Sequence, residues 1–301
     1  MRRGWSTLGW ACAFAVWSFC ANAQTFSWNW TGFYVGADAG FVSSRSFSST
    51  QAAVSATPYL LTTTPTPGAN SPFAVFNANA VDTLNARGAE GGVHAGYNWQ
   101  LKPFAVGLEI DYGAFRANAV RDTTFALSSI TTGAGAAAVN TTVISQLHSE
   151  TNTNWLFTVR PRIGWVYGVL YGYITGGAAF TSFTASTRYS DVFLANGLIS
   201  TSQSKVGWTM GAGLEIAIAP RWTLRAEYLR VEFSGITGVG RITNGGVPAA
   251  GVGGLGTFNP ISLSADYKSD MVRVGVSHKF QWWFEEPVPP VAPGPVVVTK
   301  D

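Results

Sequence analysis

The sequence predicts an all-β fold, an eight-stranded antiparallel β-barrel with four long loops at one end and a proline-rich C-terminal tail. Three observations favour this fold. Segments along the chain alternate between two kinds of residue with a period of two, the period of a β-strand with two different faces. The connections between consecutive segments are alternately long and short. In most segments one face is large and apolar, whereas glycine, threonine and charged residues share the other.

The clearest pattern runs from Lys205 to Phe233, on both sides of a turn at Pro220-Arg221. Large apolar residues recur there at every second position: Val206, Trp208, Met210, Leu214, Ile216, Ile218, Trp222, Leu224 and Tyr228. Gly, Thr, Glu and Arg fill most of the positions between them. This pattern predicts an antiparallel hairpin of two strands.

Similar alternation predicts the other six strands, in chain order at 31–41, 91–101, 104–115, 155–165, 170–180 and 271–280. Short turns are expected at Lys102-Pro103 and near Tyr167-Gly168. Long loops, polar or rich in small residues, are expected at 42–88, 116–153, 182–204 and 234–269. The faces of the strand at 170–180 are not assigned, because both carry aromatic residues or glycine.

The first 23 residues are expected to be a secretory signal peptide, with Arg2 and Arg3 before an apolar run from about Leu8 to Phe19 and Ala21-Asn22-Ala23 at the cleavage site. The run is short for a membrane-spanning helix. Both cysteines lie in this segment, so the mature chain has neither a disulfide framework nor thiolate chemistry. Cleavage removes two of the 19 basic residues and none of the 16 acidic ones. The nearly neutral remainder predicts no nucleic-acid partner.

The large apolar face is expected to point outward into a membrane. An eight-stranded barrel has an interior just wide enough for side chains, so Trp and Phe fit outside and the glycine-rich face fits inside. A soluble barrel is the alternative, but in water this outer face would be an apolar belt that soluble monomers rarely expose. In lipid, a closed barrel leaves no backbone group unpaired. Short turns would then face the periplasm and long loops the cell exterior.

Charged residues on the small-residue face are assigned to the lumen, since each Arg at the bilayer midplane would cost about 2–4 kcal/mol on the lipid side. The expected lumen ion-pair network comprises Asp38, Glu109, Asp111, Arg160, Arg162, Glu215, Arg225, Glu227 and Arg273. Arg230 and Glu232 fall on the lipid-facing positions and are placed above the outer interface. Such a network would plug the lumen rather than line a pore.

Several segments together resemble one known family: NWTGFYVGADAGF, GGVHAGYNWQLKPFAVGLEIDYGAF, WLFTVRPRIGWVYGVLYGYITGGAAF, GWTMGAGLEIAIAPRWTLRAEYLRVEF and MVRVGVSHKF. They are similar to the opacity-type surface-antigen barrels of alphaproteobacteria, most clearly in GYNWQ and in GAGLE paired with RAEY. The resemblance covers the strands and not the loops. It implies an outer-membrane location, a lipid bilayer as partner and insertion by the outer-membrane machinery. Family roles include envelope integrity, surface contact, small-solute passage and, in some members, haemin binding.

The C-terminus departs from this family, whose barrels usually end at a terminal aromatic residue. Phe280 occupies that place, and Trp282 and Phe284 keep its parity, so the terminal strand is expected to continue as an aromatic girdle. The barrel is therefore expected over 24–284. A proline-rich tail at 285–301 cannot join a sheet and is expected to be extended in the periplasm. A periplasmic or cell-wall partner for this tail is one interpretation, and a solvated tail is the other.

No catalytic, cofactor or metal site is expected, and the protein is not expected to be an enzyme. Ser277 and His278 are neighbours in one strand and point to opposite faces. His94 is expected to be a hydrogen-bonded filler of the lumen, and His148 a solvated loop residue. Haemin binding, which rests on the resemblance alone, would use His148, Tyr59 or Tyr189 in the loops. The expected function is structural and interfacial, with a narrow porin and a haemin receptor as alternatives.

Overall fold

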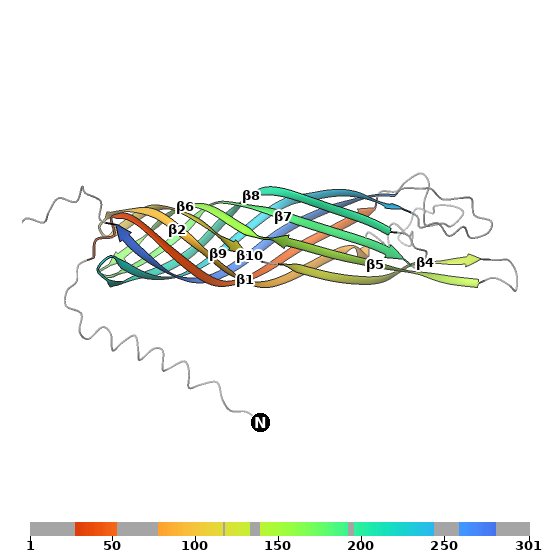
Figure 1. Cartoon of the computed structure of the whole chain (residues 1–301), viewed down its shortest axis with the longest axis horizontal. Helices are drawn as coiled ribbons and strands as arrows, with labels where there is room; N and C mark the ends of the chain where they lie inside the picture. The colour runs from red at the N-terminus through yellow and green to blue at the C-terminus, as the bar shows by residue number, and fades with distance from the viewer. Residues whose placement is uncertain are drawn as a thin grey trace, which may run out of the picture.

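The computed structural model describes most of the chain, namely residues 28–52, 78–116, 118–132, 139–191, 196–243 and 259–280. These residues are almost entirely β-strand (Figure 1). The strands are β1 (Gly32–Ala52), β2 (Val81–Leu101), β3 (Phe104–Phe115), β4 (Ala119–Thr132), β5 (Val139–Thr153), β6 (Trp155–Tyr167), β7 (Leu170–Asp191), β8 (Asn196–Ala219), β9 (Trp222–Thr243) and β10 (Asn259–Phe280). Among the described residues, no helix is both long and apolar enough to cross a membrane.

Eight of these strands close into a ring in the order β7-β6-β3-β2-β1-β10-β9-β8, and β8 pairs with β7 again. Every neighbouring pair is antiparallel. The predicted eight-stranded antiparallel barrel is therefore confirmed. Closure removes the exposed sheet edges that an open sheet would present.

The two ends of the ring differ. One end, called the turn end below, holds the tight turns between β2 and β3, β6 and β7, and β8 and β9. Gly168 and Arg221 adopt positive φ angles of 58° and 74° in two of these turns, as tight hairpins require. The opposite end is called the loop end. There β4 and β5 form a hairpin that projects beyond the other strands (Figure 1).

This hairpin extends two strands of the ring. β4 begins shortly after β3 ends, and β5 ends at Thr153, just before β6 begins at Trp155. On β7, pairing with β6 reaches Phe180, and pairing with β5 takes over from Phe183 to Asp191. β3 with β4, and β5 with β6, thus behave as two interrupted strands of the same barrel, which is why the ring still counts eight.

The expected loops were wrong in their bounds, because strands occupy much of them. β7 and β8 cover 182–204 except for 192–195, and β1 continues to Ala52 instead of ending near 41. The extension of β1 keeps a period of two. Ser44, Ser46, Ser48 and Thr50 are buried, and Phe47 between them is exposed. The polar composition of these segments concealed their strand pattern.

An apolar belt surrounds the ring outside. Its exposed side chains include Val93, Trp99, Leu108, Ile110, Ile163, Trp165, Ile174, Met210, Leu214, Leu224, Val272 and Val274. From Trp222 to Arg230, a tilted strand rises about 20 Å, close to the apolar height of an outer-membrane barrel. The structure also assigns the faces of β7, which sequence left open: Tyr171 and Tyr173 point inward, and Ile174 points outward.

Candidate functional site in the barrel lumen

All nine charged residues assigned to the lumen are buried in the ring, each less than a tenth exposed. They come from β1, β3, β6, β8, β9 and β10. They reach the same space because alternate residues of a strand point to the same face. The structure joins all nine into one network of ion pairs.

Glu109 on β3 forms ion pairs with three of the four arginines of the network. Its Oε1 lies 2.8 Å from Arg160 Nη2, and its Oε2 lies 3.2 Å from Arg162 Nη1 and 2.9 Å from Arg225 Nη1. Tyr34 also donates its hydroxyl to Oε2, at 2.7 Å. Four donors on one carboxylate satisfy its acceptor sites, which a buried charge requires.

Arg273 on β10 is a second centre of the network. It pairs with Asp38 at 3.2 Å, with Asp111 at 2.8 Å and with Glu227 at 2.6 Å. Arg160 links this centre to the first, because it contacts both Asp111 and Glu227. The two centres therefore form a continuous layer across the lumen rather than separate pairs.

Two further contacts close the network. Arg225 Nη2 lies 2.8 Å from Asp38, and Arg162 Nη1 lies 2.7 Å from Glu215 on β8. Arg162 Nε donates to Asn98 at 3.0 Å, and the hydroxyl of Tyr173 donates to Glu227 at 3.0 Å. These contacts tie strands on different sides of the ring together across the lumen.

Three lumen tyrosines were missed by the sequence analysis. The guanidinium of Arg162 lies 4.6 Å from the ring centroid of Tyr34, 5.0 Å from that of Tyr173 and 5.4 Å from that of Tyr171. At these distances, cation–π interactions with the three tyrosine rings stabilise the guanidinium. Tyr171 and Tyr173 lie in β7, whose faces the sequence left unassigned, and Tyr34 shares the parity of Asp38 in β1.

His94 connects β1 and β10 inside the ring. Its Nδ1 lies 2.7 Å from Asp38 Oδ2, and its Nε2 lies 2.8 Å from Ser277 Oγ. Gly36 lies between His94 and Ser277 in the sheet and makes this contact possible, since a Cβ there would come within 2.3 Å of Nε2. In the sequence, the histidine next to Ser277 is His278, which points to the opposite face. The register of three strands was needed to find the true partner.

An acid, a histidine and a serine in this order also occur in hydrolases. Here all three side chains are buried, and Asp38 already pairs with Arg225 and Arg273. Ser277 is 3% exposed, so its hydroxyl is packed inside the ring. Within the described part of the chain, no group of three or more His, Cys, Asp or Glu residues is placed to hold a metal ion.

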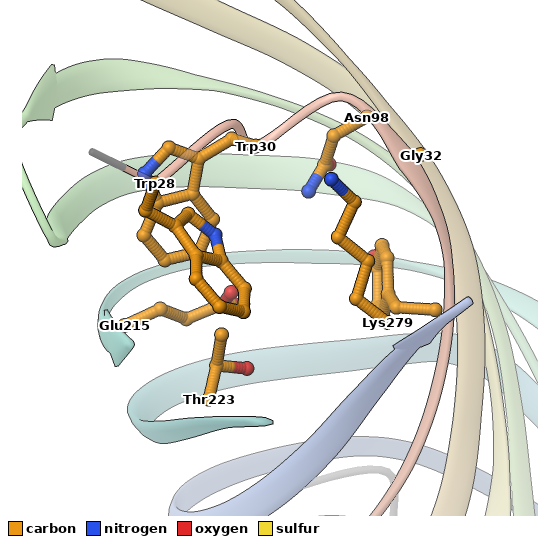
Figure 2. A pocket seen from close by; sticks show the side chains of 8 residues that line it. Trp28, Trp30, Gly32, Asn98, Glu215, Thr223 and Lys279 are labelled. Atoms are coloured by element: carbon orange, nitrogen blue, oxygen red, sulfur yellow. The ribbon is translucent and has the colours of Figure 1, made fainter. Parts of the chain in front are cut away.

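The lumen is also filled at the turn end. The segment before β1 turns inward, and Trp28 and Trp30 are buried there beside Lys279 (Figure 2). The ring of Trp30 lies 5.2 Å from that of Tyr171, and its backbone N–H donates to Gln100 Oε1 at 2.7 Å. A small pocket at this end is lined by Trp28, Trp30, Gly32, Tyr34, Asn98, Glu215, Thr223 and Lys279.

Aromatic side chains fill the loop end. Phe183 lies 5.1 Å from Phe233 and 4.9 Å from Tyr267 between ring centroids, and Phe115 packs against Tyr267 at 6.2 Å. The Tyr267 hydroxyl donates to Ser44 Oγ at 2.6 Å, and burial raises the pKa of Tyr267 to about 12. Cap, charged network and aromatic cluster thus follow one another along the interior.

Other residues singled out from the sequence are spread over the molecule. Phe280 points outward and packs against Phe33. His148 and Tyr189, expected in loops, lie in β5 and β7, and Tyr189 is buried against Ser145. Tyr59, Trp282, Phe284, the signal segment 1–23 and the tail 285–301 lie outside the described residues.

The chain is similar to known outer-membrane proteins. The family of outer membrane protein beta-barrel domains matches residues 11–280. The 31 kDa outer-membrane immunogenic protein of Brucella melitensis is 30% identical over 271 residues, which cover 86% of this chain and 87% of that protein. The outer membrane protein OprG from Pseudomonas aeruginosa shares 11% identity at a TM-score of 0.35, covering 83% of this chain and 97% of that one. The outer membrane protease OmpT from Escherichia coli shares 6% identity at a TM-score of 0.41, covering 85% and 99%.

Proposed function

This chain belongs to the family of outer membrane protein beta-barrel domains, and we propose that it serves as a sealed structural barrel that presents its loop end at the cell surface. The protein is an outer-membrane β-barrel, and its location is the outer membrane. The proposal concerns what the barrel does there. One observation supports it above all: four arginines and five carboxylates are ion-paired across the lumen.

A sealed lumen follows from the fit between these side chains and the ring. Eight strands enclose a space just wide enough for side chains. In this barrel that space is taken in turn by Trp30, by the network around Glu109 and by the aromatic cluster around Phe183. We therefore assign the network a structural role: it ties opposite walls of the barrel together and blocks solute passage.

The loop end suits presentation at the surface. From Arg230 to Thr243, β9 continues beyond the apolar belt for about 30 Å along the barrel axis. β4 and β5 project further still (Figure 1). The Brucella melitensis relative is named an immunogenic outer-membrane protein. By analogy, the extended strands of this chain would be the part that other surfaces and antibodies meet.

Two alternatives have weaker support. A narrow porin would need an open path past Glu109 and Arg160, which contact one another in the bore. A haemin receptor would need an accessible Tyr or His, yet Tyr189 is buried and His148 Nδ1 lies 2.6 Å from Asp122.

We further propose insertion by the outer-membrane machinery through the terminal strand that ends near Phe280. A periplasmic partner for the tail stays a proposal without structural support.

Liposome swelling and surface labelling test this proposed function together. Liposomes containing the refolded barrel should not swell in small sugars, and swelling would favour the porin. On intact cells, a cysteine introduced at Ser186 on the extended part of β7 should react with a membrane-impermeant maleimide. A cysteine at Thr31, at the turn end, should react only after the outer membrane is opened. The reverse labelling pattern would overturn the proposed orientation.

A further inference from the structure

A group of charged side chains interrupts the outer surface just above the apolar belt. On β9 and β10, Arg230 Nη2 lies 2.8 Å from Glu232, and Lys268 Nζ lies 3.6 Å from the same carboxylate. Arg230 also lies 3.6 Å from Asp270. These side chains point away from the lumen and are partly exposed. With the loop end outside, as in the proposed function on which this inference rests, they stand at the height where the hydrocarbon of the outer leaflet ends.

Two arginines on the adjoining strands extend this group. Arg45 on β1 lies directly opposite Lys268 on β10, and Arg87 on β2 lies opposite Ser43, the next outward position of β1. Both side chains are exposed on the outer face. Arg45 and Arg87 are diagonal neighbours in the sheet, so their Cα atoms are about 7–8 Å apart, within joint reach of one small anion.

The charges of this surface do not balance. Arg230 and Lys268 share the carboxylates of Glu232 and Asp270. Within the described ranges, neither Arg45 nor Arg87 makes an ion pair. Asp266 is also exposed on the outer face of β10, two residues from Lys268. The patch formed by Arg45, Arg87, Arg230 and Lys268 with Glu232, Asp270 and Asp266 therefore carries a formal excess of one positive charge.

Apolar side chains lie directly below the charges. Next in the sheet toward the turn end, Val272 pairs with Phe41 on one side and with Tyr228 on the other. Phe41 is 78% exposed and Val272 60% exposed, both toward the lipid. A ligand for this surface would thus meet guanidinium groups above and an apolar wall below.

We propose that the outer face of β9, β10, β1 and β2 binds the phosphate group of a phosphorylated glycolipid of the outer leaflet. Arg45 and Arg87 hold the phosphate, since guanidinium groups donate two parallel hydrogen bonds to its oxygens. Lys268 adds charge from the next strand, and the acyl chains of the glycolipid lie along Phe41 and Val272. The acids orient Arg230 and Lys268 and keep them spread over the surface.

Binding of diphosphorylated lipid A to the refolded chain in detergent micelles tests this site, with complexes counted by native mass spectrometry during a titration. The test variant is R45Q/R87Q. The control is R188Q/R241Q, which removes the same charge from exposed positions of β7 and β9 outside the patch. Heat-modifiable gel mobility checks that each variant is folded.

Wild type and R188Q/R241Q should bind one lipid A with similar affinity, and R45Q/R87Q about tenfold or more weakly, the effect of losing hydrogen bonds to a charged group. Dephosphorylated lipid A should bind wild type as weakly as intact lipid A binds R45Q/R87Q. Equal affinity of wild type and R45Q/R87Q would overturn the site. Displacement of lipid A by inorganic phosphate at equal concentration would reassign it to a free anion and overturn the glycolipid.

Discussion

Arg225 on β9 and Glu109 on β3 meet in the middle of the barrel, four strands apart in either direction around the ring. Arg225 Nη1 lies 3.0 Å and 2.9 Å from the two carboxylate oxygens. An ion pair between diametrically opposite strands crosses the full width of the lumen. It also couples the two halves of the ring, so the lumen network should govern both permeability and stability.

Replacing Glu109 with Gln should strongly destabilise the barrel. Arg160, Arg162 and Arg225 would each lose a charged partner, and breaking a buried pair costs about 3–5 kcal/mol. The measurement is the free energy of unfolding in guanidinium chloride from detergent micelles. Asp122→Asn is the matched control, because its pair with His148 is exposed and worth about 0–1 kcal/mol. Equal effects of the two substitutions would argue against a structural network.

Replacing Trp30 with Ala should loosen the cap at the turn end. The indole is buried against Tyr171, and removing a packed Trp costs about 3 kcal/mol or more. Trp30→Phe should cost less than Trp30→Ala, because its ring keeps part of the contact with Tyr171 and Nε1 of Trp30 has no hydrogen-bond partner among the described residues. Unfolding midpoints of the two variants measure this. A Phe variant as unstable as the Ala variant would show that ring packing is not what holds the cap.

Gly213→Ala should disturb the lumen from β8. A Cβ at this position would come within 2.5 Å of the Tyr173 ring, which must move and lose its hydrogen bond to Glu227. Such overpacking costs about 1–3 kcal/mol. Gly172→Ala is the matched control, since its Cβ would meet only Leu214 at 3.6 Å. If both substitutions were neutral in unfolding experiments, the lumen would be less tightly packed than the structure shows.

Tyr267 should make the stability of the loop end depend on alkaline pH. Burial raises its pKa from the usual 10 to about 12, so the folded side chain keeps its proton where the unfolded one loses it. The stability that Tyr267 contributes is complete below pH 10 and falls as pH rises toward 12. Wild type should therefore lose its advantage over Tyr267→Phe across this window, in unfolding followed at several pH values. A pH-independent difference between the two proteins would contradict this.

Sequence periodicity was enough to predict the ring and to assign nine charges to its inner face. The reason is physical. A register shift of one residue would move every side chain of a strand to the other face, so a strand with one face toward lipid and the other toward the lumen must keep its alternation of residue types. The same alternation did not predict how far the strands extend toward the loop end. Above the membrane both faces are polar or small, as in Ser44 to Thr50, and the contrast between the faces disappears.

Contacts inside the lumen were beyond sequence reasoning for a different reason. They join residues from distant strands, and the partner depends on shear, register and side-chain length together. His94 reaches Ser277 only because Gly36 leaves space between them. Both faces of β7 carry aromatic residues, so only the contacts of Tyr171 and Tyr173 with Arg162 show which of them point inward.

Single-channel recording shows whether the charged network seals the barrel. The refolded chain is inserted into a planar bilayer, and heat-modifiable gel mobility confirms that it is folded. We expect no steady current at moderate voltage, because Glu109 and Arg225 close the bore between the Trp30 cap and the aromatic cluster. Stable, uniform current steps whose conductance changes on substitution of Glu109 or Arg160 would show an open lumen and contradict a sealed barrel.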